Sequence, residues 1–277
     1  MIFATYSKES KRVNTDSMSA PVRRISVVIP CYNDARLLEP TLRSLTQQSL
    51  PFYELIVVDN NCTDDSAVVA RNFGARVVKE SRQGISFATR AGFDAATGDV
   101  LMRTDADIAA GPDFHAVLQE VWRGIDKRNA RGVGRRIVGW SGGARFSLPG
   151  WRGDVVSALY LWAYRLSVGS ALGHAPFFGT NFCIDAAWWQ KRGKNVDVSD
   201  PEVHEDLHLS FMVQPDESVE FHPRVRVATD ARAVRGTTQL RRRFARGIYT
   251  MQKNFRTQSP PQRLRERAMF RLSKESE

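Results

Sequence analysis

Two carboxylates stand two residues apart in Asp105-Ala106-Asp107, shortly after the apolar run Val100-Leu101-Met102. Divalent cations such as Mg²⁺ prefer oxygen ligands, and they commonly take one or two protein carboxylates together with water and phosphate oxygens. The pair could therefore hold a cation that also binds a diphosphate. Two acids at this spacing also arise by chance, so solvated loop carboxylates are the alternative interpretation.

A second acidic pair, Glu205-Asp206, lies where a polar segment leads into a predicted helix. A positioned carboxylate can act as a general base and take the proton from a hydroxyl group. The alternative is an ordinary helix start, because the helix dipole favours carboxylates in the first turn. His204 and His208 stand at a spacing that can bind zinc, but we do not expect zinc because no third ligand is recognisable.

Four short apolar runs alternate with helical patterns in the first part of the chain. Ile25–Pro30 is rich in β-branched residues and ends at a proline, which is typical of a parallel strand buried on both faces. Thr63 is placed to cap the helix that follows the second run. The predicted strands are 25–30, 54–59, 75–78 and 99–102, and the predicted helices are 35–48, the segment after Thr63, and 86–96.

This alternation predicts an open parallel sheet covered by helices. Ligands of such sheets bind beyond the carboxyl ends of the strands. The polar segments Pro30–Asn33, Asp59–Asn61 and Asp105–Asp107 all follow predicted strands, so we expect them to converge on one crevice. Each could instead be an ordinary turn, since Asn, Asp and Pro favour turns for local reasons.

Composition indicates one sizeable α/β domain. The 277 residues are 42% hydrophobic and 25% charged, which is ordinary globular usage. The formal net charge of +10 could attract nucleic acid, an anionic membrane surface or a phosphorylated substrate, and basic residues crowd together at Arg241–Arg243 and Arg246. Cys31, Cys62 and Cys183 show neither metal-ligand spacing nor a disulfide framework, which favours a reducing compartment.

The sequence predicts a cytoplasmic protein. We find no apolar stretch of the roughly 18 residues that a membrane-spanning helix requires, and the polar segment 1–23 lacks the apolar middle of a secretory signal. We expect residues 1–23 to form a flexible leader. Val155, Leu159, Trp162 and Leu166 recur on one helical face, which would either pack on the core or lie on a bilayer, giving peripheral contact with the inner membrane face.

The ordered set of motifs resembles the family 2 glycosyltransferases, whose nucleotide-sugar-binding fold is usually called GT-A. The resemblance covers about residues 24 to 250, and the set as a whole is far more specific than any one motif. The matching segments are Val27–Asp34, Ile56–Asp64, Gly84 through Asp99, Asp105–Asp107 and His204–Asp206.

The resemblance implies an α/β, GT-A-type open and mostly parallel sheet flanked by helices, with a C-terminal acceptor-side region. We expect the glycosyltransferase domain to cover residues 24–257. Its nucleotide-binding half would be 24–110 and its acceptor half 111–257. Residues 258–277 are expected to form a polar tail.

The resemblance also implies roles for individual residues. Pro30, Tyr32 and Asp59 would contact the nucleoside, and Asn33 and Arg90 would add donor contacts. A second set would carry the metal and the proton: Asp105 and Asp107 hold Mg²⁺ or Mn²⁺ with the ribose or diphosphate, Asp206 acts as the base, and Glu205 orients the acceptor or takes the proton itself.

Two further segments would lie on the acceptor side in such a protein. Phe177–Phe182 looks like the small-residue turn near the acceptor pocket of this family, with Gly179 allowing close backbone approach. Gln239–Gly247 lies where many relatives carry Gln-x-x-Arg-Trp, but Arg243 occupies the tryptophan position. Its arginines could hold a departing diphosphate, because guanidinium pairs well with phosphate oxygens.

The function expected from this set is inverting transfer of one sugar from a UDP- or GDP-sugar to a hydroxyl acceptor, on a glycan or a lipid-linked molecule. We expect no nucleic-acid partner and infer no obligate protein partner. The alternatives are a nucleotidyltransferase, another nucleotide-binding α/β protein, and a basic nucleic-acid-binding protein. The first would need a glycine-rich, basic first loop, and the last would need aromatic residues interleaved with the basic ones.

Overall fold

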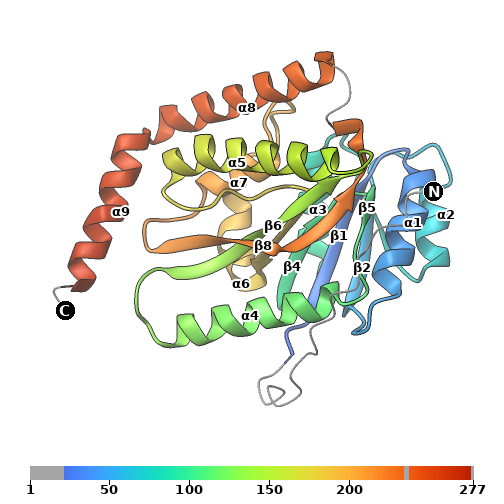
Figure 1. Ribbon diagram of the computed structural model, residues 1–277, viewed down its shortest axis with the longest axis horizontal. Coiled ribbons are helices and arrows are strands. Elements are labelled where there is room, and N and C mark those ends of the chain that lie inside the picture. Colours follow the sequence, from blue (N-terminus) through green and yellow to red (C-terminus); the bar gives the residue numbers. More distant parts are fainter. Residues whose placement is uncertain (1–21, 234–236, 276–277) are drawn as a thin grey trace.

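The computed structural model describes residues 22–233 and 237–275, which form a central mixed sheet with helices on both faces (Figure 1). The strands lie in the order β3-β2-β1-β4-β7-β6-β8-β5. In chain order the elements are β1 (Ile25–Cys31), α1 (Ala35–Thr46), β2 (Glu54–Asp59), α2 (Ser66–Asn72), β3 (Arg76–Lys79), α3 (Ile85–Ala95), β4 (Val100–Thr104), β5 (Ile108–Ala109), α4 (Phe114–Ala130), β6 (Arg136–Phe146), α5 (Arg152–Leu172), β7 (Asn181–Asp185), α6 (Ala186–Arg192), η2 (Gly193–Asn195), α7 (Glu205–Phe211), β8 (Glu217–Thr229), η3 (Ala231–Ala233), α8 (Thr237–Thr257) and α9 (Pro260–Glu275).

The first half of the sheet is parallel, as the sequence predicts. β1 pairs in parallel with β2 and β4, and β2 pairs in parallel with β3. Alternate residues of β1 face opposite layers: Val27 packs in the cluster that includes Leu42 of α1, and Val28 packs in the cluster that includes Ala88 of α3. A Cβ at Gly92 would lie 2.2 Å from a methyl carbon of Val28, so α3 rests directly on the sheet.

The second half of the sheet adds antiparallel strands to the parallel first half. β7 runs antiparallel to both β4 and β6, and β5 runs antiparallel to β8, whereas the long strands β6 and β8 pair in parallel. Four of the seven pairings among the described residues are therefore parallel, and the sheet is mixed. The antiparallel β7 places Asn181, at the start of that strand, beside Thr104 at the end of β4.

Two local expectations need correction. Helix α2 begins at Ser66, with Asp65 rather than Thr63 before its first residue. The Asp64 carboxylate explains the later start, because it accepts hydrogen bonds from the N–H of Ser66 and from the N–H of Ala35, at 3.0 and 2.9 Å, and so ties the loop to the start of α1.

The expected polar tail beyond residue 257 contains helix α9, which is packed on the fold. Arg263 is buried and donates to the carbonyl oxygens of Leu172 and Phe211, at 3.2 and 3.0 Å. These carbonyls end α5 and α7, where a helix lacks internal partners for its last oxygens. Of the expected leader, only residues 22 and 23 are described, and Arg23 pairs with Asp126 of α4.

Helix α5 also corrects the expectation that no stretch is long and apolar enough to span a membrane. Its 21 residues are long and apolar enough to cross a bilayer, and only a small part of the helix is buried. The helix packs along β6 through residues that include Gly153 and Ser157, so it is part of the folded domain. Its outward side is mostly exposed.

Candidate active site

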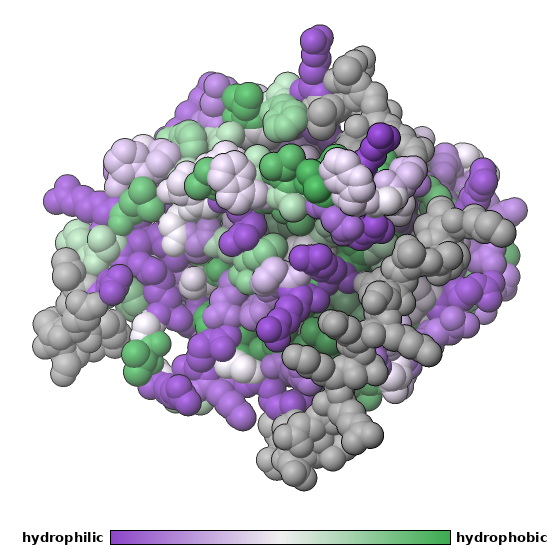
Figure 2. Space-filling view, in the orientation of Figure 1, coloured by the Kyte–Doolittle hydropathy of each residue, from purple (hydrophilic) through white to green (hydrophobic). Residues whose placement is uncertain are grey.

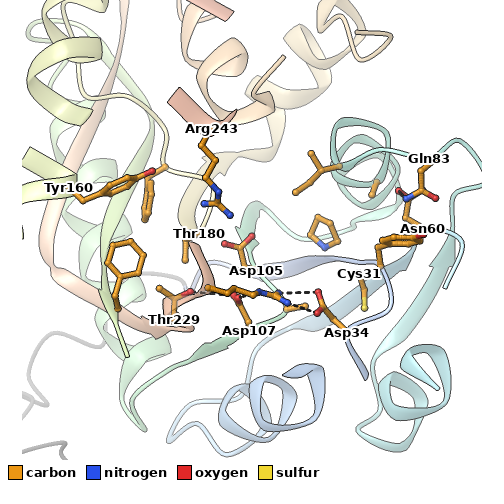
Figure 3. Close-up of a pocket in the computed structure, with 18 residues that line it drawn as sticks. Cys31, Asp34, Asn60, Gln83, Asp105, Asp107, Tyr160, Thr180, Thr229 and Arg243 are labelled. Carbon is orange, nitrogen blue, oxygen red and sulfur yellow. Dashed lines mark hydrogen bonds and ion pairs between the residues drawn. The ribbon is translucent and has the colours of Figure 1, made fainter. Parts of the chain in front are cut away.

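A cavity of about 460 Å³ opens beyond the carboxyl ends of β1 and β4, where the sequence predicts the crevice (Figure 3). Of the predicted site residues, Pro30, Tyr32, Asp105 and Asp107 line it. The C-terminal half of the chain closes its other side. The residues contributed from there are Phe146, Tyr160, Phe178, Thr180, Thr229, Arg232 and Arg243.

The two carboxylates of the predicted metal motif differ in their partners. Asp107 is largely buried and pairs with Arg232, whose Nε lies 2.8 Å from its Oδ2. The same guanidinium reaches Asp34 with Nη1 to Oδ1 at 2.7 Å, so it bridges the two acids across the cavity floor (Figure 3). Burial and the nearby charge of Asp105 raise the pKa of Asp107 to about 6, against the opposing effect of Arg232.

These carboxylates fit a divalent cation that shares its ligands with a substrate. Within residues 22–233 and 237–275, no group of three or more His, Cys, Asp or Glu side chains is placed to hold a metal ion. The protein thus offers two carboxylates, and water and phosphate oxygens would complete the shell, which is how Mg²⁺ is usually bound. The pKa of Asp107 is raised first by burial and then by the negative charge of Asp105, and a bound cation would oppose both effects.

Arg103 of β4 joins the two acidic pairs, and sequence reasoning missed it. Its side chain is only 4% exposed, and its guanidinium donates to Asp105 Oδ1 and to the carbonyl oxygen of Gly179. Its Nε lies 3.0 Å from Glu205 Oε1. Burial alone would lower the pKa of this guanidinium, but Asp105, Glu205 and Asp206 outweigh that effect and raise it.

Glu205 and Asp206 begin α7 behind the cavity wall, and neither lines the main cavity. Asp206 accepts hydrogen bonds from the N–H of Gly179 at 2.7 Å and of Leu207 at 2.8 Å. Glu205 accepts from the Thr89 hydroxyl at 2.9 Å, and burial raises its pKa while Arg103 opposes the change. The backbone at Gly179 therefore lies between Asp206 and the cavity, which the neighbouring residues Phe178 and Thr180 line.

Arg90, expected to contact the donor, does not line the main cavity. It lines a small neighbouring cavity together with Glu205, and its Nε lies 3.6 Å from Asp94 Oδ2. Asn33 and Asp59 also lie outside the lining. Asn33 accepts from the N–H of Thr63 and Asp59 from the N–H of Cys62, at 2.7 and 2.8 Å, so both shape the loop at the rim.

The side of the cavity at the ends of β1 and β2 contains one further polar anchor. Asn60 is buried, and its amide donates to the carbonyl oxygens of Glu80 and Arg82, at 2.8 and 2.7 Å. Its Oδ1 accepts from the N–H of Gly84, which precedes α3. Asn60 thereby fixes the loop from 80 to 84 at the cavity edge, next to the exposed ring of Tyr32.

The histidines of the segment His204–His208 have the spacing of a zinc-binding His-Glu-x-x-His motif, but both rings have other partners. His204 Nε2 lies 3.0 Å from the carbonyl oxygen of Arg243, and His208 Nδ1 lies 3.0 Å from Asn254 Oδ1. His204 precedes the first residue of α7, so the two rings do not share a helix face.

Two arginines face the acids across the cavity. Arg243 of α8 points toward Asp105, and Arg232 lies between Asp107 and Asp34 (Figure 3). The sequence marks Arg243 as a phosphate-binding candidate and includes Asp34 in a segment that carries the resemblance, without a role of its own. Arg232 carries no signal that distinguishes it from other charged loop residues. The roles of Asp34 and Arg232 become visible only when β8 brings residue 232 next to the end of β1.

Comparison with known proteins gives the family. Residues 26–194 match the sequence model described as Glycosyl transferase family 2. An uncharacterized glycosyltransferase of Mycobacterium tuberculosis is 35% identical over 140 residues, which make up 45% of this chain and 62% of that protein. The chain thus spans less than two thirds of the length of this curated relative.

Solved structures show the same fold. A mannosyltransferase from Pyrobaculum calidifontis, in complex with GDP-Man and Mn²⁺, aligns with a TM-score of 0.63 at 20% identity, covering 92% of this chain and 71% of that one. Glucosyl-3-phosphoglycerate synthase from M. tuberculosis, in complex with Mn²⁺, UDP and glucosyl-3-phosphoglycerate, aligns with a TM-score of 0.52 at 21% identity, covering 84% and 80%. The architecture is therefore of the GT-A type, and because the family model covers more than half of its residues, this chain belongs to Glycosyl transferase family 2.

Proposed function

We propose that this chain transfers a single sugar from a nucleotide diphosphate sugar to a hydroxyl acceptor, assisted by Mg²⁺ or Mn²⁺ and with inversion at the anomeric carbon. The observation that carries the proposal is the position of Asp105 and Asp107 in a cavity beyond the parallel strand ends, with two arginines beside them. This is the place where open α/β sheets bind nucleotides. Family membership favours this reaction over the nucleotidyltransferase and nucleic-acid alternatives.

The donor would lie along the first half of the sheet. Pro30 and Tyr32 border the nucleoside end, and Asp105 and Asp107 would hold the cation. When bound, the cation would stabilise the negative charge that develops on the diphosphate as the glycosidic bond breaks. Arg243 would pair with phosphate oxygens from the opposite side, because a guanidinium matches the geometry of phosphate.

The acceptor would enter beside Tyr160 and Phe178, and Asp206 would receive its hydroxyl proton. The carboxylate of Asp206 is held by two backbone N–H groups, so its orientation is fixed. Burial raises the pKa of Tyr160, Arg243 opposes this change, and the negative charge of Asp206 adds to it. This effect of Asp206 on Tyr160 fits a position close behind the cavity wall. Attack by the acceptor itself inverts the anomeric carbon and needs no protein nucleophile.

Arg103 would fix the position of the donor side of the site relative to the acceptor side. It contacts both Asp105 and Glu205, and it holds the Gly179 carbonyl whose residue also donates to Asp206. A shift of either acid would therefore be transmitted to the other.

The test is a screen of UDP- and GDP-sugars for hydrolysis and binding, with and without Mn²⁺, in wild type, Asp105→Ala and Asp206→Asn. Asp113→Asn is the matched control, because Asp113 is exposed and its side chain makes no capping hydrogen bond. Asp105→Ala is expected to weaken metal-dependent donor binding. Asp206→Asn is expected to bind the donor normally and to lose roughly 10²- to 10⁴-fold in transfer rate, the usual contribution of a general base.

The outcomes separate the parts of the proposal. Wild-type transfer by Asp206→Asn would overturn the assignment of the base. Donor binding that needs no metal and ignores Asp105→Ala would overturn the cation site. The cytoplasmic location stays a prediction.

A further inference from the structure

Helix α5 presents an apolar face to solvent. Large side chains recur along it at intervals of four, four, three and four residues, which places them on one side of a helix. They are between 42% and 71% exposed. The residues that we call the α5 face are Trp151, Val155, Leu159, Trp162 and Leu166.

The α5 face is not the side of the helix that packs on the core. The opposite side of the helix is the one that packs inward, through residues that include Val168 and Leu172. Figure 2 shows hydrophobic and aromatic side chains gathered over α5 in the upper part of the molecule, with hydrophilic ones around them. An exposed apolar patch of this kind marks an interaction surface.

Helix α8 lies beside α5 and adds to this side of the molecule (Figure 1). Its Met251 and Phe255 pack against the cluster that contains Val168 of α5. One and two turns earlier, Ile248 and Phe244 continue the same helical face but are exposed.

The charge of the two helices fits an anionic partner. Together α5 and α8 carry eight arginine and lysine residues and one acidic residue. Two of the basic residues are engaged elsewhere, because Arg243 points into the cavity and Lys253 pairs with Asp197 and Asp200. The one acidic residue, Asp154, is paired with Arg145 at 2.8 Å. Arg241 and Arg242 are exposed next to Phe244, so basic and apolar groups are adjacent. A helix with Trp and Leu on one side and nearby basic residues is typical of segments that lie in a membrane interface.

Helix α5 is apolar enough to cross a bilayer, but its contacts keep it in the fold. The Tyr164 hydroxyl donates to the Phe177 carbonyl at 2.8 Å, and Tyr160 lines the cavity. Removing the helix would dismantle the acceptor side of the site. A bilayer can therefore be met only by the outward side of α5, with the helix axis in the membrane plane.

We propose that the α5 face, together with the exposed residues Arg241, Phe244 and Ile248 of α8, docks on the surface of an anionic lipid bilayer. Leu159 points outward and its neighbour Tyr160 lines the cavity, so docking would bring the acceptor side next to the lipid headgroups. Resting on the proposed function, this favours an acceptor hydroxyl carried by a membrane-held molecule over one free in solution.

The test is co-sedimentation of the full chain with vesicles of phosphatidylcholine alone or mixed with phosphatidylglycerol. The test variant is Leu159→Glu/Trp162→Glu, and Val133→Glu is the matched control, since Val133 is 83% exposed in the loop between α4 and β6. Wild type and Val133→Glu are expected to bind the anionic vesicles and to bind less as salt is raised. The double variant is expected to lose about tenfold or more in binding, since it removes two apolar groups and adds two negative charges.

Two results would overturn the proposal: wild type that does not prefer anionic vesicles, or a double variant that binds them as wild type does. Light scattering tests the alternative that a second copy of this chain, and not a bilayer, covers the α5 face. A wild-type dimer that the double variant converts to a monomer, without vesicle binding, would make the α5 face a self-association surface instead. Mn²⁺-dependent nucleotide binding in solution is measured on the same variants and should be unchanged, so failure of docking is distinguishable from failure of the proposed function.

Discussion

Arg103 is buried among acids, and this placement has an energetic consequence. A buried charge is tolerated only when partners compensate its lost hydration. Asp105 and Glu205 supply that compensation, with ion-pair distances of 2.5 and 3.0 Å. Each acid in turn depends on Arg103, so the predicted metal ligand and the first residue of α7 are coupled through one side chain.

Arg103→Met is expected to lower the free energy of unfolding by about 3–5 kcal/mol, because it leaves the buried carboxylate of Glu205 without its ion-pair partner. Arg43→Met is the control: its ion pair with Glu39 is half exposed on α1, and such pairs contribute about 1 kcal/mol or less. Urea unfolding of both variants provides the measurement. Similar losses in the two variants would contradict the account of Arg103.

Arg232 occupies the position beside Asp107 where a cation would bind. Arg232→Ala is therefore expected to bind Mn²⁺ alone at least about fivefold more tightly, since two unit charges about 4 Å apart interact by roughly 1 kcal/mol even when fully screened by water. Calorimetric titration measures this, with Arg71→Ala, an exposed arginine of α2, as the control for lost net charge. Unchanged or weaker Mn²⁺ binding would show that Arg232 and the cation do not compete for Asp107.

At the scale of elements, α9 fastens the ends of α5 and α7 through buried polar groups. His174 follows the end of α5 and is 9% exposed. Its Nδ1–H donates to the Ala175 carbonyl at 2.8 Å, and its Nε2 faces Arg263, 3.4 Å away, with Arg267 also nearby. Burial, followed by the charge of Arg267, lowers the pKa of His174 to about 3. The ring is therefore neutral in the folded protein.

This gives a pH dependence of stability. Below about pH 6.5 the unfolded chain protonates His174 while the folded chain does not, so the group costs up to about 1.4 kcal/mol per pH unit as the pH falls toward 3. The measurement is the unfolding free energy of wild type and His174→Asn between pH 6.5 and 5, where most carboxylates stay ionised. A shallower slope in the variant is expected, and identical slopes would contradict a neutral, buried His174.

The same elements show what the sequence could and could not predict. β2 spans Glu54–Asp59, the predicted range, because a run of buried β-branched residues is a local signal. The parallel pairing of β6 with β8 has no local signal, since it joins residues about 80 positions apart such as Trp140 and Glu220. Helix α9 was missed because its buried side includes the arginines Arg263 and Arg267, and a hydrophobicity pattern assigns arginine to the solvent-exposed side of a helix.

Some residues of the candidate site could likewise be predicted from the sequence, and others could not. Asp105 and Asp107 could be located because they end a predicted strand, and both line the cavity. Arg90 could not be placed, because whether a helical arginine faces the donor depends on the rotation of α3 against the sheet. The burial of Arg103 was equally invisible, since one arginine in a strand looks like an exposed residue until β7 and α7 cover it.

At the scale of the whole molecule, the two halves of the sheet have separate tasks. The parallel half presents Pro30, Tyr32 and the acids at one edge, and the mixed half brings Tyr160 and Arg243 to face them. The side of the cavity that contains Tyr160 lies against α5, whose outer surface is apolar. The proposed positions of the donor, the acceptor and the membrane surface all depend on the position of the cation.

The most direct test is a crystal structure with Mn²⁺ and whichever of UDP and GDP binds more tightly, with manganese located by anomalous diffraction. One manganese is expected to be bound by the carboxylates of Asp105 or Asp107 and by oxygens of the diphosphate, with the nucleobase beside Tyr32. A manganese and nucleotide bound away from these carboxylates, or a diphosphate in the cavity with no manganese contact, would contradict the proposed cation site.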